Sequence, residues 1–97
     1  MIGSFADSGS EDVFNGVPSQ RARRVCPEVL WGSVQRKLDQ LNRVRTLTEL
    51  RVPPGNRLER LVGDRAGQYS LRINTQYRIC FRWDDVHAYN VEITDYH

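Results

Sequence analysis

The sequence contains few of the residues that build metal, redox or covalent catalytic sites. It has only two cysteines, Cys26 and Cys80, and two histidines, His87 and His97. The cysteines match no metal or redox spacing, so we expect two buried thiols, and two histidines are too few for a histidine-rich metal site. No nucleophile motif, phosphate-binding glycine loop or paired-carboxylate spacing occurs. We therefore expect a protein that uses no metal and no cofactor.

Long apolar runs are also missing. No stretch approaches the length that crosses a bilayer, and no signal peptide is visible, which predicts a cytoplasmic protein without a membrane partner. The chain has 97 residues, enough for one domain whose core folds without disulfide bonds. Residues 1–97 are therefore expected to form a single domain.

Lysine is nearly absent, because 13 of the 14 basic residues are arginine and Lys37 is the exception. The net charge is only +2, yet residues 1–20 and 84–97 together carry seven acidic and no basic side chains. All of the basic residues consequently fall within residues 21–83. An arginine-rich middle suits a polyanion such as RNA, although surface arginines are also common on small soluble domains.

The strongest pattern in the chain is the stretch from Gln68 to Trp83, which predicts two strands and a tight turn. Apolar or aromatic residues occupy every second position, namely Tyr69, Leu71, Ile73, Tyr77, Ile79, Phe81 and Trp83. Such alternation is typical of strands with one buried face. Residues paired across a hairpin share a face, which predicts a three-residue loop over 74–76 with Asn74 or a neighbour in the left-handed conformation. Leu71 then lies opposite Ile79.

The same register places Arg72 opposite Arg78 on the other face of the hairpin. Facing like charges cost up to ~1 kcal/mol. Either a carboxylate elsewhere in the sheet, such as Glu92, neutralises the two arginines, or they converge on an anion. A phosphate is the anion that guanidinium groups match best, because they bind it bidentately. We expect the Arg78 side chain to be exposed on its strand.

Three helical segments precede the hairpin. Ser8–Glu11 has capping-box spacing and predicts a short helix that ends at Gly16. A second helix is expected over Ser19–Val25, and the main helix over Pro27–Arg43. The core stripe of the main helix consists of Leu30, Val34, Leu38 and Leu41. The arginines of the second helix either form a solvated face or contact an RNA backbone, and they are Arg21, Arg23 and Arg24.

The remaining segments predict the rest of the sheet. Met1–Ala6 is a weak strand candidate, and Arg57–Gly63 is another whose apolar residues do not alternate cleanly. A turn at residues 84–85 leads to a last strand with Tyr89, Val91 and Ile93 on one face. The order of elements predicts an α+β fold. We expect an N-terminal strand and two to three helices packed on one face of a mostly antiparallel sheet of four to five strands.

The tail of the sequence, Asp95-Tyr96-His97, offers an acid–base pair and an aromatic ring. RNA cleavage without a metal requires that the 2′-hydroxyl is deprotonated, the charge on the phosphorane is stabilised and the leaving 5′-oxygen is protonated. Arginines can stabilise that charge, and the tail can transfer protons or stack a base. The alternative is that the tail frays and plays no part, as chain ends commonly do.

Several stretches resemble the HigB toxins, which are members of the RelE/ParE toxin superfamily. They are PPGNRLE at 53–59, GDRAGQYSLRIN at 63–74, QYRICFRW at 76–83 and VEITDYH at 91–97, with EDVFNG, RARRVCP and RKLDQLN earlier in the chain. The resemblance covers nearly the whole chain and implies a RelE-like fold. It also implies the toxin of a type II toxin–antitoxin system, a ribosome-dependent endonuclease (mRNA interferase) that cuts mRNA in the A site, inhibits translation and arrests growth.

The resemblance also implies partners and site residues. The partners are a HigA-type helix-turn-helix antitoxin, the 70S ribosome with its mRNA, and operator DNA through the antitoxin complex. The catalytic residues would be Arg72, Arg78, Asp95, Tyr96 and His97. The residues that bind RNA or the ribosome would be Arg57, Arg60, Arg65, Arg82, Arg21, Arg23 and Arg24.

One position departs from the family, because relatives often have a lysine where this chain has Val62. Arginine is a poor proton donor, since its pKa lies above about 12. We therefore expect the arginines to stabilise charge and His97 or Asp95 to transfer protons. Two other functions remain open on the same fold. One is a ParE-like protein that poisons gyrase by binding, and the other is a degenerate toxin that only binds its antitoxin and regulates its operon.

Overall fold

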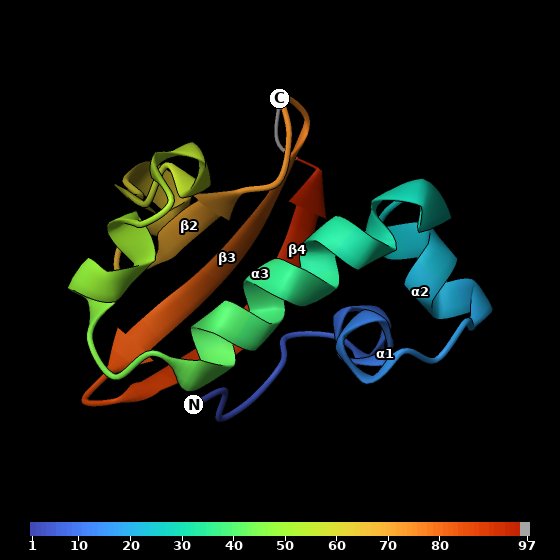
Figure 1. Ribbon diagram of the computed structural model, residues 1–97, viewed down its shortest axis with the longest axis horizontal. Coiled ribbons are helices and arrows are strands. Elements are labelled where there is room, and N and C mark those ends of the chain that lie inside the picture. Colours follow the sequence, from blue (N-terminus) through green and yellow to red (C-terminus); the bar gives the residue numbers. More distant parts are fainter. Residues whose placement is uncertain (96–97) are drawn as a thin grey trace.

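Helices and sheet form two layers in the computed structural model, which describes residues 1–95 (Figure 1). The α-helices are α1 (Ser8–Asn15), α2 (Gln20–Val25) and α3 (Trp31–Arg43). The strands are β1 (Glu59–Arg60), β2 (Tyr69–Arg72), β3 (Tyr77–Asp84) and β4 (His87–Asp95). They form one antiparallel sheet in the order β1-β2-β3-β4. The expected α+β architecture is confirmed for the described part of the chain.

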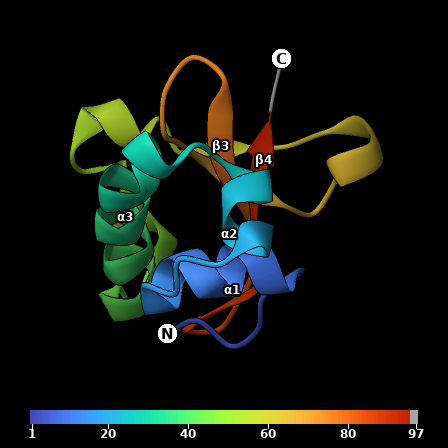
Figure 2. The same ribbon diagram turned by 90° about the vertical axis from the view of Figure 1, so that its right-hand side faces the viewer.

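Short 3₁₀ turns complete the chain between the main elements. They are η1 (Glu28–Leu30), η2 (Leu47–Arg51), η3 (Pro54–Asn56) and η4 (Gly63–Arg65). Figure 2 shows the helical layer on one side of the sheet and the loop that carries η4 on the other side. No helix within residues 1–95 has both the length and the apolar character needed to cross a membrane.

The first residues run alongside β4 without forming a regular strand. Ile2 bridges Ala88 and Phe5 bridges Val91, both in the parallel sense. The expected N-terminal strand is therefore reduced to two isolated bridges. These bridges still cover the free edge of β4. An uncovered edge strand can pair with another chain, and the first residues hinder such pairing here.

The starts of two helices differ from those predicted. The N-cap of α1 is Asp7 rather than Ser8, because the Asp7 carboxylate accepts a hydrogen bond from the backbone N–H of Ser10 at 2.6 Å. The main helix does not begin at Pro27, because η1 intervenes and α3 starts at Trp31. At the other end of α1, Gly16 takes the left-handed conformation with φ 72°, which glycine adopts without strain.

The core lies between α3 and the sheet. Val34, Leu38 and Leu41 of α3 are fully buried, and so are the facing sheet residues Leu71, Ile79, Phe81 and Val91. Full burial of one such side chain stabilises a fold by about 1.5–3 kcal/mol. The predicted helical stripe is confirmed for these three residues, while Leu30 lies at the edge of the core and is only half-buried.

The β2–β3 hairpin has the predicted register. Leu71 pairs with Ile79, and Arg72 pairs with Arg78. The prediction of a left-handed residue in its loop is wrong, because none of residues 74–76 has a positive φ. The side chain of Asn74 closes the turn instead, by accepting hydrogen bonds from the backbone N–H groups of Gln76 at 2.9 Å and Tyr77 at 2.7 Å.

A β-bulge in β4 changes which side chains face the core. Cys80 pairs with Glu92 but Arg82 pairs with Tyr89, so β4 carries one more residue than β3 between these pairs. The extra residue is accommodated at Asn90, whose φ is 52°. The prediction that Tyr89 shares a face with Val91 and Ile93 is therefore wrong. Ala88 occupies the core position before the bulge and is fully buried.

The connector after α3 is held by one buried amide rather than by a strand. Asn56 donates to Gln40 Oε1 at 2.9 Å and to the Leu50 carbonyl at 3.1 Å, and it accepts a hydrogen bond from Lys37 Nζ at 2.8 Å. The predicted strand over 57–63 shrinks to the two residues of β1. Its apolar residues do not alternate because most of this segment is loop.

Asp12 links α1 to α2 by a contact that is sensitive to acid. Its carboxylate accepts hydrogen bonds from Arg21 Nε at 2.6 Å and from the Ser19 hydroxyl at 2.6 Å. The Arg21 bond, supported by the Ser19 bond, lowers the pKa of Asp12 below its ordinary value. A carboxyl group whose pKa is lower in the folded chain stabilises the fold above the pKa of the unfolded chain, and this contribution is lost as the pH falls through the folded-state pKa.

We therefore expect Asp12→Asn to lower the melting temperature at neutral pH and to flatten its decline in acid. Thermal unfolding followed by circular dichroism between about pH 6 and about pH 2 measures both effects. The wild-type protein should lose more stability over this range than the variant, because only the wild type has the Asp12 carboxylate to protonate. Equal declines in both proteins would show that the Asp12 contact contributes no pH dependence.

Candidate functional site

The sheet face that points away from the helices carries the candidate site, and we call it the arginine face. The register places Ser70, Arg72, Arg78, Cys80, Glu92 and Thr94 on it. The loop that contains η4 covers part of this face, since Leu61, Ser70 and Cys80 are buried. The Ser70 hydroxyl has no hydrogen-bond partner among the described residues. The arginine face thus has a buried polar floor with charged side chains above it.

Arg78 is held firmly at the centre of this face. Its Nη2 donates to the Arg57 carbonyl at 3.0 Å and lies 3.4 Å from Glu59 Oε1. Only 12% of the side chain is exposed, so the expectation of an exposed strand arginine is wrong. Burial arises because the chain before β1 folds over the hairpin, with Arg57 in the left-handed conformation at φ 43°. These contacts fix the position of the guanidinium group.

Arg72 lies directly opposite Arg78 and has a different environment. Its Nε donates to the Asn74 carbonyl at 3.2 Å, and the side chain is half-buried. Within residues 1–95 no carboxylate forms an ion pair with Arg72. The arginine face therefore presents an uncompensated positive charge beside a guanidinium of fixed position.

Glu92 pairs with a different arginine from the two that were expected. Its Oε1 lies 3.0 Å from Arg65 Nη1, which also donates to Gln68 Oε1 at 3.0 Å. Neutralisation by a carboxylate does occur at Arg78, but Glu59 provides it. The Glu92 pair anchors the η4 loop to β4 and brings Arg65 to the arginine face.

Of three further predicted basic residues, Arg82 and Arg57 flank the arginine face and Arg60 does not. Arg82 is exposed and lies against Gly67, where a Cβ would meet Arg82 Nη1 at 2.8 Å. Arg57 is exposed, and its backbone carbonyl accepts the hydrogen bond from Arg78. Arg60 pairs with Tyr69, so its side chain projects on the helix side of the sheet. Sequence reasoning could not separate Arg60 from its neighbours, because β1 has too few residues to show a period.

The arginines of α2 belong to the helical layer, away from the arginine face. Arg21 is bonded to Asp12. Arg23 lies 3.4 Å from Glu28 and 5.9 Å from the ring centroid of Trp31. Arg24 is exposed. The structure therefore does not bring these residues together with Arg72 and Arg78, and any contact that they make with RNA would involve a separate surface.

The tail is described only as far as Asp95. This residue pairs with Tyr77, so its side chain shares the parity of Tyr77 and not that of Arg78. Its Oδ2 accepts a hydrogen bond from Gln76 Nε2 at 3.1 Å. Tyr96 and His97, the other predicted tail residues, lie outside the described residues.

The two cysteines are buried, and their thiols are expected to be unreactive. Burial raises the pKa of the Cys26 thiol to about 11. Burial also raises the pKa of Cys80 on the floor of the arginine face, although the Thr94 hydroxyl acts in the opposite direction. A thiol with a raised pKa is a poor nucleophile because little thiolate forms near neutral pH. In the part of the chain that the structure describes, no group of three metal-ligating side chains gathers.

Glu59 is the member of the site that sequence reasoning missed. It pairs with Ser70 across β1 and β2, which turns its carboxylate toward Arg78. Only the register of β1 against β2 reveals this contact. A strand of two residues is too short to show that register in the sequence. Val62, the position that was expected to depart from the family, is 84% exposed on the η4 loop.

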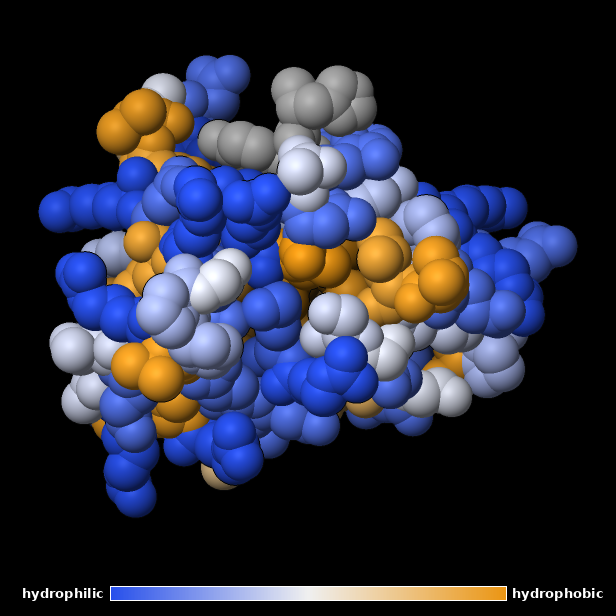
Figure 3. All heavy atoms as spheres, turned by 45° about the horizontal axis from the view of Figure 1, so that its top comes forward, coloured by the Kyte–Doolittle hydropathy of each residue, from blue (hydrophilic) through white to orange (hydrophobic). Residues whose placement is uncertain are grey.

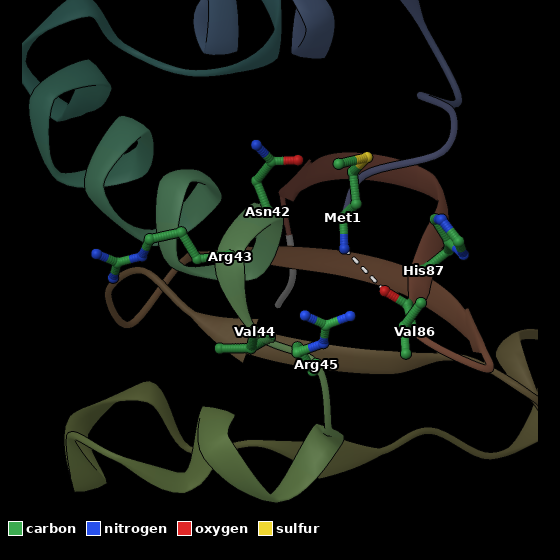
Figure 4. Close-up of a pocket in the computed structure, with 7 residues that line it drawn as sticks. All are labelled: Met1, Asn42, Arg43, Val44, Arg45, Val86 and His87. Atoms are coloured by element: carbon green, nitrogen blue, oxygen red, sulfur yellow. Dashed lines mark hydrogen bonds between the residues drawn. The ribbon is translucent and has the colours of Figure 1, made fainter.

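Other surface features lie away from the arginine face. Figure 3 shows a face of the molecule on which hydrophilic side chains cover much of the surface and surround apolar patches. A pocket of about 280 Å³ lies where the first residue meets the end of α3 and the β3–β4 turn, and Figure 4 shows the residues that line it. There the amine of Met1 donates to the Val86 carbonyl at 2.8 Å, and Arg45 extends toward both while Arg43 points away. This pocket contains none of the predicted catalytic residues.

Comparison with known proteins identifies the family. Residues 4–97 match the model of the RelE-like toxin of the type II toxin–antitoxin system HigB. Toxin HigB-1 of Vibrio cholerae serotype O1 is 40% identical over 90 residues, covering 93% of this chain and 92% of that protein. An uncharacterized protein of Haemophilus influenzae is 34% identical over 74 residues, covering 67% of this chain and 73% of that protein.

A solved structure supports the fold independently. A chain of the YoeB–YefM complex from Staphylococcus aureus matches with a TM-score of 0.61 and 16% identity, covering 100% of this chain and 98% of that chain. At this identity the likeness shows the fold alone. Because the family match spans almost the whole chain, and the Vibrio relative is similar over nearly all of it, this chain belongs to the HigB family of RelE-like toxins of type II toxin–antitoxin systems.

Proposed function

We propose that this toxin is a ribosome-dependent endoribonuclease that cleaves mRNA in the A site. The observation that carries the proposal is the pair Arg72 and Arg78, directly opposite each other on a face that the helices leave uncovered. A scissile phosphate placed between them would meet one guanidinium of fixed position and one uncompensated charge. Guanidinium groups suit the phosphorane that forms during cleavage because they offer several fixed donors to its oxygens.

In the proposed reaction the 2′-oxygen attacks the phosphorus and the bond from phosphorus to the 5′-oxygen breaks. A base accepts the proton of the 2′-hydroxyl, an acid gives a proton to the leaving 5′-oxygen, and a 2′,3′-cyclic phosphate results. The arginines keep their protons and stabilise the charge of the transition state. We assign proton transfer to His97 first, because an imidazole group can both accept and donate a proton near neutral pH. Tyr96 would stack a base.

We expect the reaction to depend on the ribosome, because the arginine face offers few side chains that could transfer protons. Its two carboxylates, Glu59 and Glu92, are each paired with an arginine. Binding energy from the ribosome can position the mRNA for attack and so supply what these groups do not. A type II toxin also implies an antitoxin partner, and we propose a HigA-type helix-turn-helix protein whose complex with the toxin binds operator DNA.

Primer extension on an mRNA in a purified translation system, with and without ribosomes, tests the proposal. We expect cuts at codon positions only when ribosomes are present, and we expect His97→Ala to reduce them strongly. The matched control is Arg36→Gln, which removes an exposed charge on α3 outside the predicted RNA-binding residues and should cut like the wild type. Growth arrest without cuts, together with loss of gyrase supercoiling, would replace the proposal with a gyrase poison. Neither effect, with antitoxin binding retained, would indicate a degenerate toxin.

A further inference from the structure

A pocket of about 310 Å³ opens on the helix side of β1, and only this short strand separates it from the arginine face. It is lined by Leu47, Thr48, Arg51, Leu58, Arg60 and Tyr69. These residues come from η2, from β1 and the residue before it, and from β2. Such a volume is at the lower end of the range for small-molecule sites, about 300–1,000 Å³, and suits one compact group.

The aromatic wall of this pocket is fixed by the core. Tyr69 pairs with Phe81, and the two rings stack with centroids 6.1 Å apart at an interplanar angle of 29°. Phe81 is fully buried, whereas Tyr69 is only half-buried. Arg60 lies directly opposite Tyr69 in the β1–β2 pair, so the two side chains project to the same face. A rigid ring thus stands beside a guanidinium group.

The charge of this pocket is positive and uncompensated. Arg51 and Arg60 are exposed, and no carboxylate among residues 1–95 forms an ion pair with either of them. None of the described lining residues is acidic. Glu49 in the same turn is turned away, because its carboxylate accepts hydrogen bonds from the backbone N–H groups of Arg45 at 2.8 Å and Thr46 at 2.9 Å.

We propose that this pocket binds one unpaired nucleotide of an RNA strand, an inference that rests on the proposed action on RNA. The base would lie against Tyr69 between Leu47 and Leu58, and its phosphate between Arg51 and Arg60. Any base of single-stranded RNA can stack on an aromatic side chain. A guanidinium group can donate two parallel hydrogen bonds to two oxygens of one phosphate. An acidic protein segment would use the two arginines but would leave the aromatic wall without a specific role.

The strand β1 connects this pocket to the arginine face. Glu59 and Arg60 are successive residues, so their side chains project on opposite faces of the sheet. Glu59 contacts Arg78 on one face, and Arg60 lines the pocket on the other. An RNA strand that crosses β1 would therefore engage both sites at once. The pocket would fix the strand a short distance from the phosphate that is cleaved.

Fluorescence anisotropy with a fluorescein-labelled single-stranded 2′-O-methyl oligonucleotide tests the inference without ribosomes. This probe lacks the 2′-hydroxyl nucleophile and cannot be cleaved by the proposed reaction. We expect Tyr69→Leu to weaken binding about tenfold or more, as loss of one stacking contact does, and Tyr69→Phe to bind like the wild type. The double variant Arg51→Gln/Arg60→Gln should also bind weakly and show a smaller salt dependence.

The charge-matched control is Arg36→Gln/Arg43→Gln, which removes two exposed charges of α3 outside the pocket. The inference is overturned if both double variants lose affinity equally, or if natively folded Tyr69→Leu binds like the wild type. It is also overturned if the wild type does not bind the probe, or if labelled oligoglutamate alone shows the dependence on Tyr69. Failure of the proposed function would appear separately, as an absence of cuts by the wild-type protein on ribosomes.

Discussion

Replacing Arg78 by glutamine is expected to reduce mRNA cleavage by about 10²–10³-fold, the loss typical when one charge-stabilising donor is removed from an active site. Glutamine carries no charge to pair with Glu59 or with a phosphate, and its shorter side chain no longer reaches the Arg57 carbonyl. The loss of stability should stay within about 2 kcal/mol, because the Glu59 partner is half exposed, so that the ion pair contributes little, and one hydrogen bond contributes about 1 kcal/mol. Single-turnover cleavage on purified ribosomes and a thermal melt provide the two measurements.

Glutamine is a better test than alanine at this position. With only 12% of the Arg78 side chain exposed, alanine would leave a larger cavity than glutamine and would add a packing loss to the loss of charge. The matched control is Arg43→Gln, an exposed arginine of α3 that lies outside the candidate site and forms no ion pair within residues 1–95. Arg78→Gln cleaving at the wild-type rate would remove this residue from the mechanism. A large loss of stability in the same variant would reassign it to folding.

Phe81→Ala is expected to destabilise the fold by about 3–5 kcal/mol, the usual cost of truncating a fully buried aromatic residue. Phe81 lies on the central strand β3, is fully buried, and stacks on Tyr69. Such a loss is a large share of the about 5–15 kcal/mol that a domain has in total. For a chain of this size it lowers the melting temperature by about 15–30 °C.

Urea unfolding followed by tryptophan fluorescence measures this change. Phe81→Leu should lose clearly less, because it leaves a smaller cavity. Val62→Ala is the surface control, since Val62 is 84% exposed, and its effect should stay within about 0.5 kcal/mol. If Phe81→Ala unfolded at the same urea concentration as Val62→Ala, the two layers would not depend on this contact.

The parts of the fold that follow from local periodicity could be predicted from the sequence. The alternation over residues 69–83 determines which side chains are buried, and cross-strand pairing then requires that Arg72 faces Arg78. The stripe of α3 was equally readable, because Val34, Leu38 and Leu41 repeat at helical spacing. Both patterns arise from a single element and its contact with one neighbour.

Features that depend on tertiary contacts could not be predicted. The bulge at Asn90 reverses the alternation within β4, and nothing in the residues around it distinguishes a bulge from a regular strand. Glu59 reaches Arg78 only because β1 pairs with β2, although β1 alone shows no pattern. The choice of Arg65 as the partner of Glu92 likewise depends on where the η4 loop lies.

The pairing of the first residues with β4 sets the order in which the molecule can assemble during synthesis. The Ser10 hydroxyl accepts a hydrogen bond from the Ile93 backbone N–H, and Ile2 and Phe5 bridge β4. These early residues can therefore reach their final positions only after β4 has been synthesised. Until β3 and β4 exist, the apolar stripe of α3 has no sheet to cover. Contacts so distant in sequence form late and slow folding. A nascent chain that stops before β4 should therefore lack a packed core, and the arginine face should form only when the last strand has joined the sheet.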